Sequence, residues 1–212
     1  MSNVPAASAT RNRGRTMTRV VLFVASAALA TASPAQAQTA QPASHAWEML
    51  FSSGALVPTG AERSAIKDAA LSTAQLSYVM HSQFAITTMV GWARSRDLAS
   101  ANDPKLDVFT YDIGAELRAP RSGSDDGMSL IPFAGVGVGS RSYNYRALDI
   151  DATHNVAGYG AVGGDLGKGR LHLRLEVRDY VTGFKPLTGT GPSATRNDVV
   201  ALAGLRLTRS GE

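Results

Sequence analysis

The chain has 212 residues, which is enough for one domain with a sizeable closed barrel or sandwich. It contains 21 glycines and no cysteine, so disulfides cannot stabilise the fold. Four arginines before residue 38 account for the formal charge of +4, and the remaining 17 basic residues balance 17 acidic ones, which excludes the clustered positive charge that nucleic-acid binding requires.

The N-terminal segment has the order of regions of a secretory signal peptide. Residues 11–19 are basic, Val20–Ala32 is an apolar run, and Ala35-Gln36-Ala37 is a small-x-small cleavage site. The apolar run is too short to cross a bilayer as a helix. We therefore predict a signal peptide over residues 1–37, started from either Met1 or Met17, and a short polar tail over residues 38–46.

After the tail, segments of about ten residues alternate between apolar and polar positions, the period of a β-strand. No long amphipathic helix is visible between them. We predict eight strands, with ends uncertain by a few residues, at residues 47–57, 70–80, 84–93, 105–118, 130–143, 155–166, 171–178 and 198–208.

The segment 171–178 shows the pattern most clearly. Leucine or valine occupies every odd position, and His172, Arg174, Glu176 and Arg178 occupy the even ones. A strand with this sequence has one aliphatic face and one ionic face, whereas a helix would mix the two sets around its circumference. The fold then depends on which face meets the surroundings.

Two all-β architectures fit such strands. A soluble barrel or sandwich buries the aliphatic face, and a membrane barrel turns that face toward lipid and lines its lumen with the polar face. The strand length matches a tilted membrane-crossing strand. Longer polar connections follow the first, third, fifth and seventh strands and short ones follow the second and sixth, as in outer-membrane barrels, although the connection after the fourth strand is longer than this layout requires. We predict an eight-stranded antiparallel up-and-down transmembrane β-barrel.

On this prediction the polar faces bring acids and arginines together inside a narrow lumen. A buried charge without a partner is costly, so a closed lumen should hold a near-balanced set of charges. Together with Glu48, the expected lumen ionic network consists of Asp112, Glu116, Arg118, Arg141, His172, Arg174, Glu176, Arg178 and Arg206.

The chain resembles the small eight-stranded outer-membrane barrels of Gram-negative bacteria, the OmpA- and OmpX-like class, over residues 47–209. The resemblance lies in the signal peptide, the eight alternating segments, the loop asymmetry, and a first strand running from Trp47-Glu48 to Pro58-Thr59-Gly60. It implies a monomer in the cell outer membrane that contacts outer-membrane lipid and lipopolysaccharide and meets the barrel-assembly machinery during biogenesis. One departure is the absence of a terminal aromatic residue, since the last strand continues as Thr208-Arg209-Ser210-Gly211-Glu212.

The sequence offers little chemistry, and we predict no catalytic, metal-binding or cofactor-binding residue. The alternating glycines 135, 137 and 139 lack the following helix of a dinucleotide site, and the four histidines have no metal-ligand spacing. Asp149 and Asp151 are too few carboxylates for a calcium site.

The expected role is therefore structural or surface-interacting, with a lumen filled by side chains. One alternative is a lipid A-modifying enzyme that uses Ser140, Ser142, Asp151 and His154 near one rim. The other alternative is a soluble, lipocalin-like barrel that binds a small apolar ligand.

Overall fold

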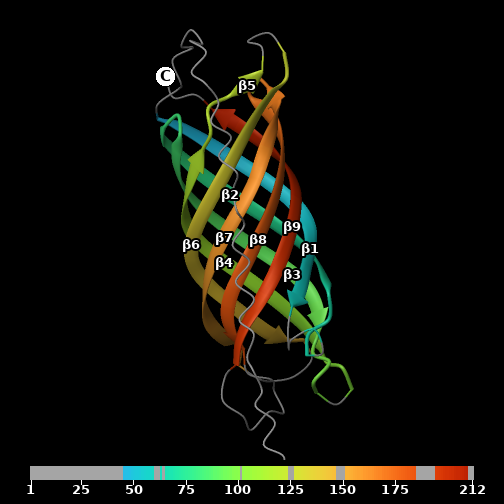
Figure 1. The fold of residues 1–212 in the computed structure, drawn as a ribbon. Helices are drawn as coiled ribbons and strands as arrows, with labels where there is room; N and C mark the ends of the chain where they lie inside the picture. Colours follow the sequence, from blue (N-terminus) through green and yellow to red (C-terminus); the bar gives the residue numbers. More distant parts are fainter. Residues whose placement is uncertain are drawn as a thin grey trace, which may run out of the picture. The chain divides into compact units, whose positions relative to one another are not determined.

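The computed structural model describes residues 45–59, 63, 65–100, 102–123, 127–146, 151–184 and 194–209. Within these ranges the chain forms antiparallel strands that close into a barrel (Figure 1). The strands are β1 (Ala46–Thr59), β2 (Ala69–His81), β3 (Phe84–Arg96), β4 (Lys105–Arg118), β5 (Ser122–Gly123), β6 (Ser129–Tyr145), β7 (Thr153–Lys168), β8 (Leu171–Phe184) and β9 (Ala194–Arg209).

Each long strand pairs with the next long strand in the sequence, and the pairing of β1 with β9 completes the ring. The sheet order is β4-β3-β2-β1-β9-β8-β7-β6-β5, and β4 also pairs with β6, which joins the two ends of the sheet. The barrel is therefore eight-stranded and up-and-down, as predicted, and β5 is a two-residue addition to its rim. The predicted signal peptide and residues 38–44 lie outside the described residues.

The connections differ between the two ends of the barrel. Two-residue turns join β2 to β3 and β7 to β8, and Gly169 in the second of these turns has a left-handed φ of 64°. The connection after β4 is longer than the expected layout requires. It contains β5, which pairs with the start of β6. At the opposite end β1, β3, β6 and β8 end and β2, β4, β7 and β9 begin. We call these the turn end and the loop end.

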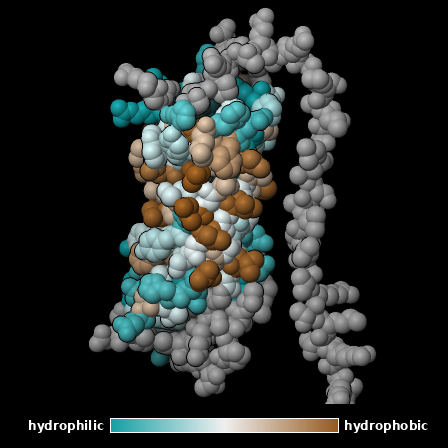
Figure 2. Space-filling view, turned by 90° about the vertical axis from the view of Figure 1, so that its left-hand side faces the viewer, coloured by the Kyte–Doolittle hydropathy of each residue, from teal (hydrophilic) through white to brown (hydrophobic). Residues whose placement is uncertain are grey.

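The outward face carries an apolar belt. Figure 2 shows hydrophobic side chains gathered around the middle of the barrel, between hydrophilic ends. This arrangement follows from the two-residue period, since alternate side chains of every long strand point outward. Exposed members of the belt are Trp47, Met49, Phe51, Leu76, Val90, Trp92, Tyr111, Ile113, Val136, Val138, Val162, Leu173, Leu175 and Leu205. Among the described residues there is no helix long and apolar enough to cross a membrane.

The interior holds both an ionic and an apolar part. The sequence predicted a polar, ionic lumen, but toward the loop end the inward positions of β1, β2, β4 and β9 also carry branched aliphatic side chains. These pack with interior tyrosines into a buried cluster that includes Leu56, Leu71, Leu106, Val108, Tyr143, Tyr145, Tyr159, Tyr180 and Val200. Part of the lumen is therefore filled as a soluble core is filled.

Candidate functional site

The chemistry of the molecule is concentrated in its charged lumen. All nine side chains of the expected network are buried and lie on inward positions of β4, β6, β8 and β9. They come from strands that lie far apart in the chain, from Asp112 on β4 to Arg206 on β9, and the closure of the barrel brings them together.

Near the turn end, Arg118 on β4 links two acids. Its Nη1 and Nη2 donate to the two carboxylate oxygens of Glu48 on β1, at 3.0 and 2.6 Å. Its Nε donates to Glu116, two residues earlier on the same strand face, at 2.7 Å. This parallel double hydrogen bond is the strong geometry for an arginine–carboxylate pair.

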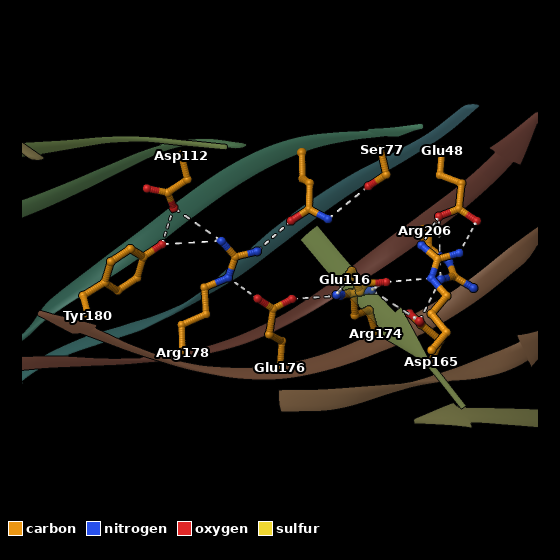
Figure 3. Close-up of polar contacts among 12 residues, drawn as sticks. Glu48, Ser77, Asp112, Glu116, Asp165, Arg174, Glu176, Arg178, Tyr180 and Arg206 are labelled. Carbon is orange, nitrogen blue, oxygen red and sulfur yellow. Dashed lines mark hydrogen bonds and ion pairs between the residues drawn. The ribbon is translucent and has the colours of Figure 1, made fainter. Parts of the chain in front are cut away.

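Arg174 on β8 lies at the centre of the network, as Figure 3 shows. It donates to Glu116 across the lumen, to Asp165 on β7 at 3.3 Å, and to Glu176 on its own strand at 2.8 Å. Arg206 on β9 reaches the same Asp165 oxygen at 2.7 Å. Acids and arginines therefore alternate along this part of the lumen. Asp165 accepts from both Arg174 and Arg206, and Glu116 accepts from Arg174 and from Arg118.

Farther along β8, Arg178 is the centre of a second group of hydrogen bonds. It donates to Glu176, to Gln75 on β2 at 2.7 Å, and to Asp112 on β4 at 3.4 Å. The hydroxyl of Tyr180 also donates to Asp112, so this carboxylate is held by two neighbours on β8 (Figure 3). Glu176 accepts from both Arg174 and Arg178 and thereby connects the two groups.

Toward the loop end, Arg141 on β6 forms a separate ion pair with Asp198 on β9, at 2.6 Å. Its guanidinium also lies over the ring of Tyr180, 4.2 Å from the ring centre. Arg174 stacks in the same way on Phe133, at 3.5 Å. The rings cover guanidinium faces that would otherwise be desolvated without a partner, which is a favourable cation–π arrangement.

His172 is the member of the expected network that makes no such contact. It is buried in the lumen, but its Nδ1 has no hydrogen-bond partner among the described residues, and no ion pair to it is present there. The structure thus connects seven of the expected residues through ion pairs, holds Arg141 in a separate pair with Asp198, and leaves His172 beside them.

Sequence reasoning missed several members of the network. Asp165 receives two arginines, but it lies on the glycine-rich β7, for which the alternation did not define an inward face. Asp198 stood on the polar face of the last predicted strand and was not counted as a lumen charge. With Asp165, Asp198 and Arg196 included, the described long strands carry six buried acids on their inward faces, Glu48, Asp112, Glu116, Asp165, Glu176 and Asp198, and six buried arginines, Arg118, Arg141, Arg174, Arg178, Arg196 and Arg206; the buried Asp97 lies just after β3.

The residues weighed for catalysis do not form a triad among the described residues. Ser142 on β6 and His154 on β7 are cross-strand partners, but no hydrogen bond joins their side chains in this part of the chain, and His154 is exposed. Asp151 is exposed just before β7, and Asp149, weighed with it for calcium, lies outside the described residues. The described residues also contain no group of histidine and acidic side chains arranged to hold a metal ion.

Comparison with known proteins reveals similarity of fold. No protein-family model matches the chain, and no curated protein matches it. The crystal structure of Neisserial surface protein A is similar with a TM-score of 0.58 and 12% sequence identity, over 79% of this chain and 99% of that one. The outer membrane protein OprG from Pseudomonas aeruginosa is similar with a TM-score of 0.52 and 11% identity, over 80% of this chain and 98% of that one. The fold is that of the small eight-stranded outer-membrane barrels, the class that the alternation predicted.

Proposed function

We propose that the protein is an outer-membrane β-barrel with a structural or surface-interaction role and a lumen closed by its own side chains. The observation that carries this proposal is the combination of an exposed apolar belt with a buried, charge-balanced interior. Soluble proteins rarely expose a continuous apolar surface of this extent, whereas a bilayer removes it from water.

The interior supports a closed barrel rather than a pore. An eight-stranded barrel is only wide enough for its side chains to fill, and here the arginine–carboxylate pairs and the apolar cluster occupy that space. A soluble, lipocalin-like barrel would need an apolar interior cavity and a polar outer face. Neither the charged lumen nor the exposed belt favours that alternative.

The proposal includes location and partners. The export signal expected over residues 1–37 and the fold support residence in the outer membrane as a monomer, with insertion by the barrel-assembly machinery. Surface contacts would then be made by the loop end, since outer-membrane barrels place their longer loops outside the cell and their short turns in the periplasm.

Membrane fractionation tests this proposal directly. After a carbonate wash, the mature protein should stay with the outer membrane, and its electrophoretic mobility should change on heating, as the closed barrel unfolds. A protein that is released by the wash and folds in buffer without detergent would contradict the proposal and favour the soluble barrel.

Conductance tests the closed lumen separately. Purified protein in planar bilayers should give little or no current. A stable, large channel would show that the lumen opens, and it would leave the membrane location intact while removing the structural role.

A further inference from the structure

A group of basic side chains projects outward at the loop end of β3 and β4. We call it the rim cluster: Lys67, Arg94, Arg96, Lys105 and Arg146. These residues line one surface hollow of about 290 Å³. The lumen network does not involve any of them.

Backbone pairing holds the rim cluster together. Arg96 and Lys105 are cross-strand partners on β3 and β4. The backbone N–H of Lys67 donates to the carbonyl of Arg96 at 3.1 Å, and that of Arg146 donates to the carbonyl of Lys105 at 3.0 Å. Four chain segments thus deliver cations to one place, and like charges that face each other directly across strands are destabilising unless an anion lies between them.

Few acidic side chains lie near the rim cluster among the described residues. Asp107 is paired with Arg146 at 3.1 Å, and Asp68 lines the hollow. Among the described residues, the other four cations of the rim cluster form no ion pair. Five cations against two carboxylates leave an uncompensated positive charge on an exposed surface.

The rim cluster adjoins the apolar belt. Trp92 precedes Arg94 on the outward face of β3, and the guanidinium of Arg94 lies over the Trp92 ring, 4.4 Å from its centre. Tryptophan is enriched where a membrane meets water, with its ring at the level of the headgroups. An anion bound here would therefore be attached to a molecule whose apolar part lies along the belt.

We propose that the rim cluster binds the phosphate groups of an outer-leaflet lipid, with lipid A as the chemical type. Guanidinium groups hold phosphate through paired, charge-assisted hydrogen bonds, and the belt below them contacts the acyl chains. The inference rests on the proposed function, because the loop end faces the outer leaflet only if the barrel spans the outer membrane.

The test measures lipid A binding to the folded, detergent-solubilised protein by native mass spectrometry. The variant is Arg94→Gln/Arg96→Gln, and the matched control is Arg170→Gln/Arg209→Gln, which removes two exposed arginines at the turn end. The first variant should weaken binding of phosphorylated lipid A about tenfold or more, and the control should bind as the native protein does. Dephosphorylated lipid A should bind the native protein as weakly as phosphorylated lipid A binds the variant.

Three outcomes would overturn the proposal. They are equal binding of phosphorylated and dephosphorylated lipid A, an equal loss in the turn-end control, and displacement of lipid A by inorganic phosphate alone at its physiological concentration. If the double variant does not fold, Lys105→Gln on the neighbouring strand replaces it. Carbonate-resistant, heat-modifiable protein that fails the binding test contradicts only the lipid site, whereas release by carbonate contradicts the proposed function.

Discussion

Arg118 at the end of β4 and Glu48 near the start of β1 are joined by two parallel hydrogen bonds, although β2 and β3 separate their strands in the barrel wall. The same spacing recurs along the lumen. Arg178 on β8 reaches Gln75 on β2 past β9 and β1, and Arg141 on β6 reaches Asp198 on β9 past β7 and β8. These three contacts therefore join strands that share no backbone hydrogen bond, and they connect opposite parts of the barrel wall from inside.

Removing the shared acid Glu116 should destabilise the barrel strongly. Glu116→Gln takes a negative charge away from Arg118 and Arg174, both of which stay buried. Breaking a buried pair on one side costs about 3–5 kcal/mol. Because both arginines keep other acids, we expect about 3 kcal/mol, measured as the free energy of unfolding in urea with the barrel in lipid vesicles.

Further variants test the physical reason. Asp103→Asn, at an exposed position between β3 and β4, should change the unfolding free energy by less than about 0.5 kcal/mol. Glu116→Gln/Arg174→Met should cost less than the sum of Glu116→Gln and Arg174→Met measured singly, because the two side chains pair with each other. If the two single costs simply add, charge pairing between Glu116 and Arg174 is not what holds this part of the lumen.

The strand pattern predicted the strands of the barrel and their outward faces more completely than the residues that fill its interior. Alternation defined both faces of 171–178 because every apolar residue there has the same parity, and the belt follows from that. It did not define the inward face of β7, where glycines occupy both parities, so Asp165 was missed. The apolar cluster was missed because Leu56 and Leu71 look like outward residues by type, although the alternation along their strands gives them the inward parity.

Pairings in the lumen could not be derived from sequence at all. Which arginine meets which acid depends on the stagger of strands around the closed barrel, and a shift of two residues in one strand preserves every inward position while changing the partners. The rim cluster is a similar case. Lys67 and Arg146 lie in connections, and only backbone pairing brings them beside Arg96 and Lys105.

A charge in the belt should destabilise the barrel according to its depth. Leu175 lies on β8 halfway between Leu171, beside the turn, and the exposed Asp179. Leu175→Arg should cost about 2–4 kcal/mol in lipid vesicles, whereas Leu171→Arg at the edge of the belt should cost about 0–1 kcal/mol. Small, equal effects at both positions would mean that water and not lipid covers this face.

Asp97 should hold the start of the 97–104 connection. Its side chain is fully buried and accepts hydrogen bonds from the backbone N–H of Ala99 at 2.9 Å and of Ser100 at 3.2 Å, and from the hydroxyl of Tyr145 at 2.7 Å. Asp97→Ala leaves these donors without that acceptor, at a cost of about 1–3 kcal/mol. We expect faster proteolysis and faster amide exchange at residues 98–100, and partial protection in Asp97→Asn, which keeps one acceptor oxygen. Unchanged exchange in Asp97→Ala would show that the connection is held by other contacts.

Glycine at position 137 makes room for an interior tyrosine. Gly137 on β6 is the cross-strand partner of Tyr159 on β7, and a methyl group at position 137 would lie 2.5 Å from both the tyrosine ring and the backbone oxygen of Ile113. Because Arg178 stacks on that ring, 4.8 Å from its centre, displacing the ring would disturb the charged lumen as well. Gly137→Ala should therefore cost about 1–3 kcal/mol, the range for overpacking an interior.

Gly160, on the exposed face of β7, has no atom within 4 Å of an added methyl group, so Gly160→Ala should be neutral or stabilising by about 0.5 kcal/mol. Unfolding in urea and the near-ultraviolet circular dichroism of the tyrosines measure both effects, and equal responses from the two variants would contradict the packing of Tyr159 against Gly137.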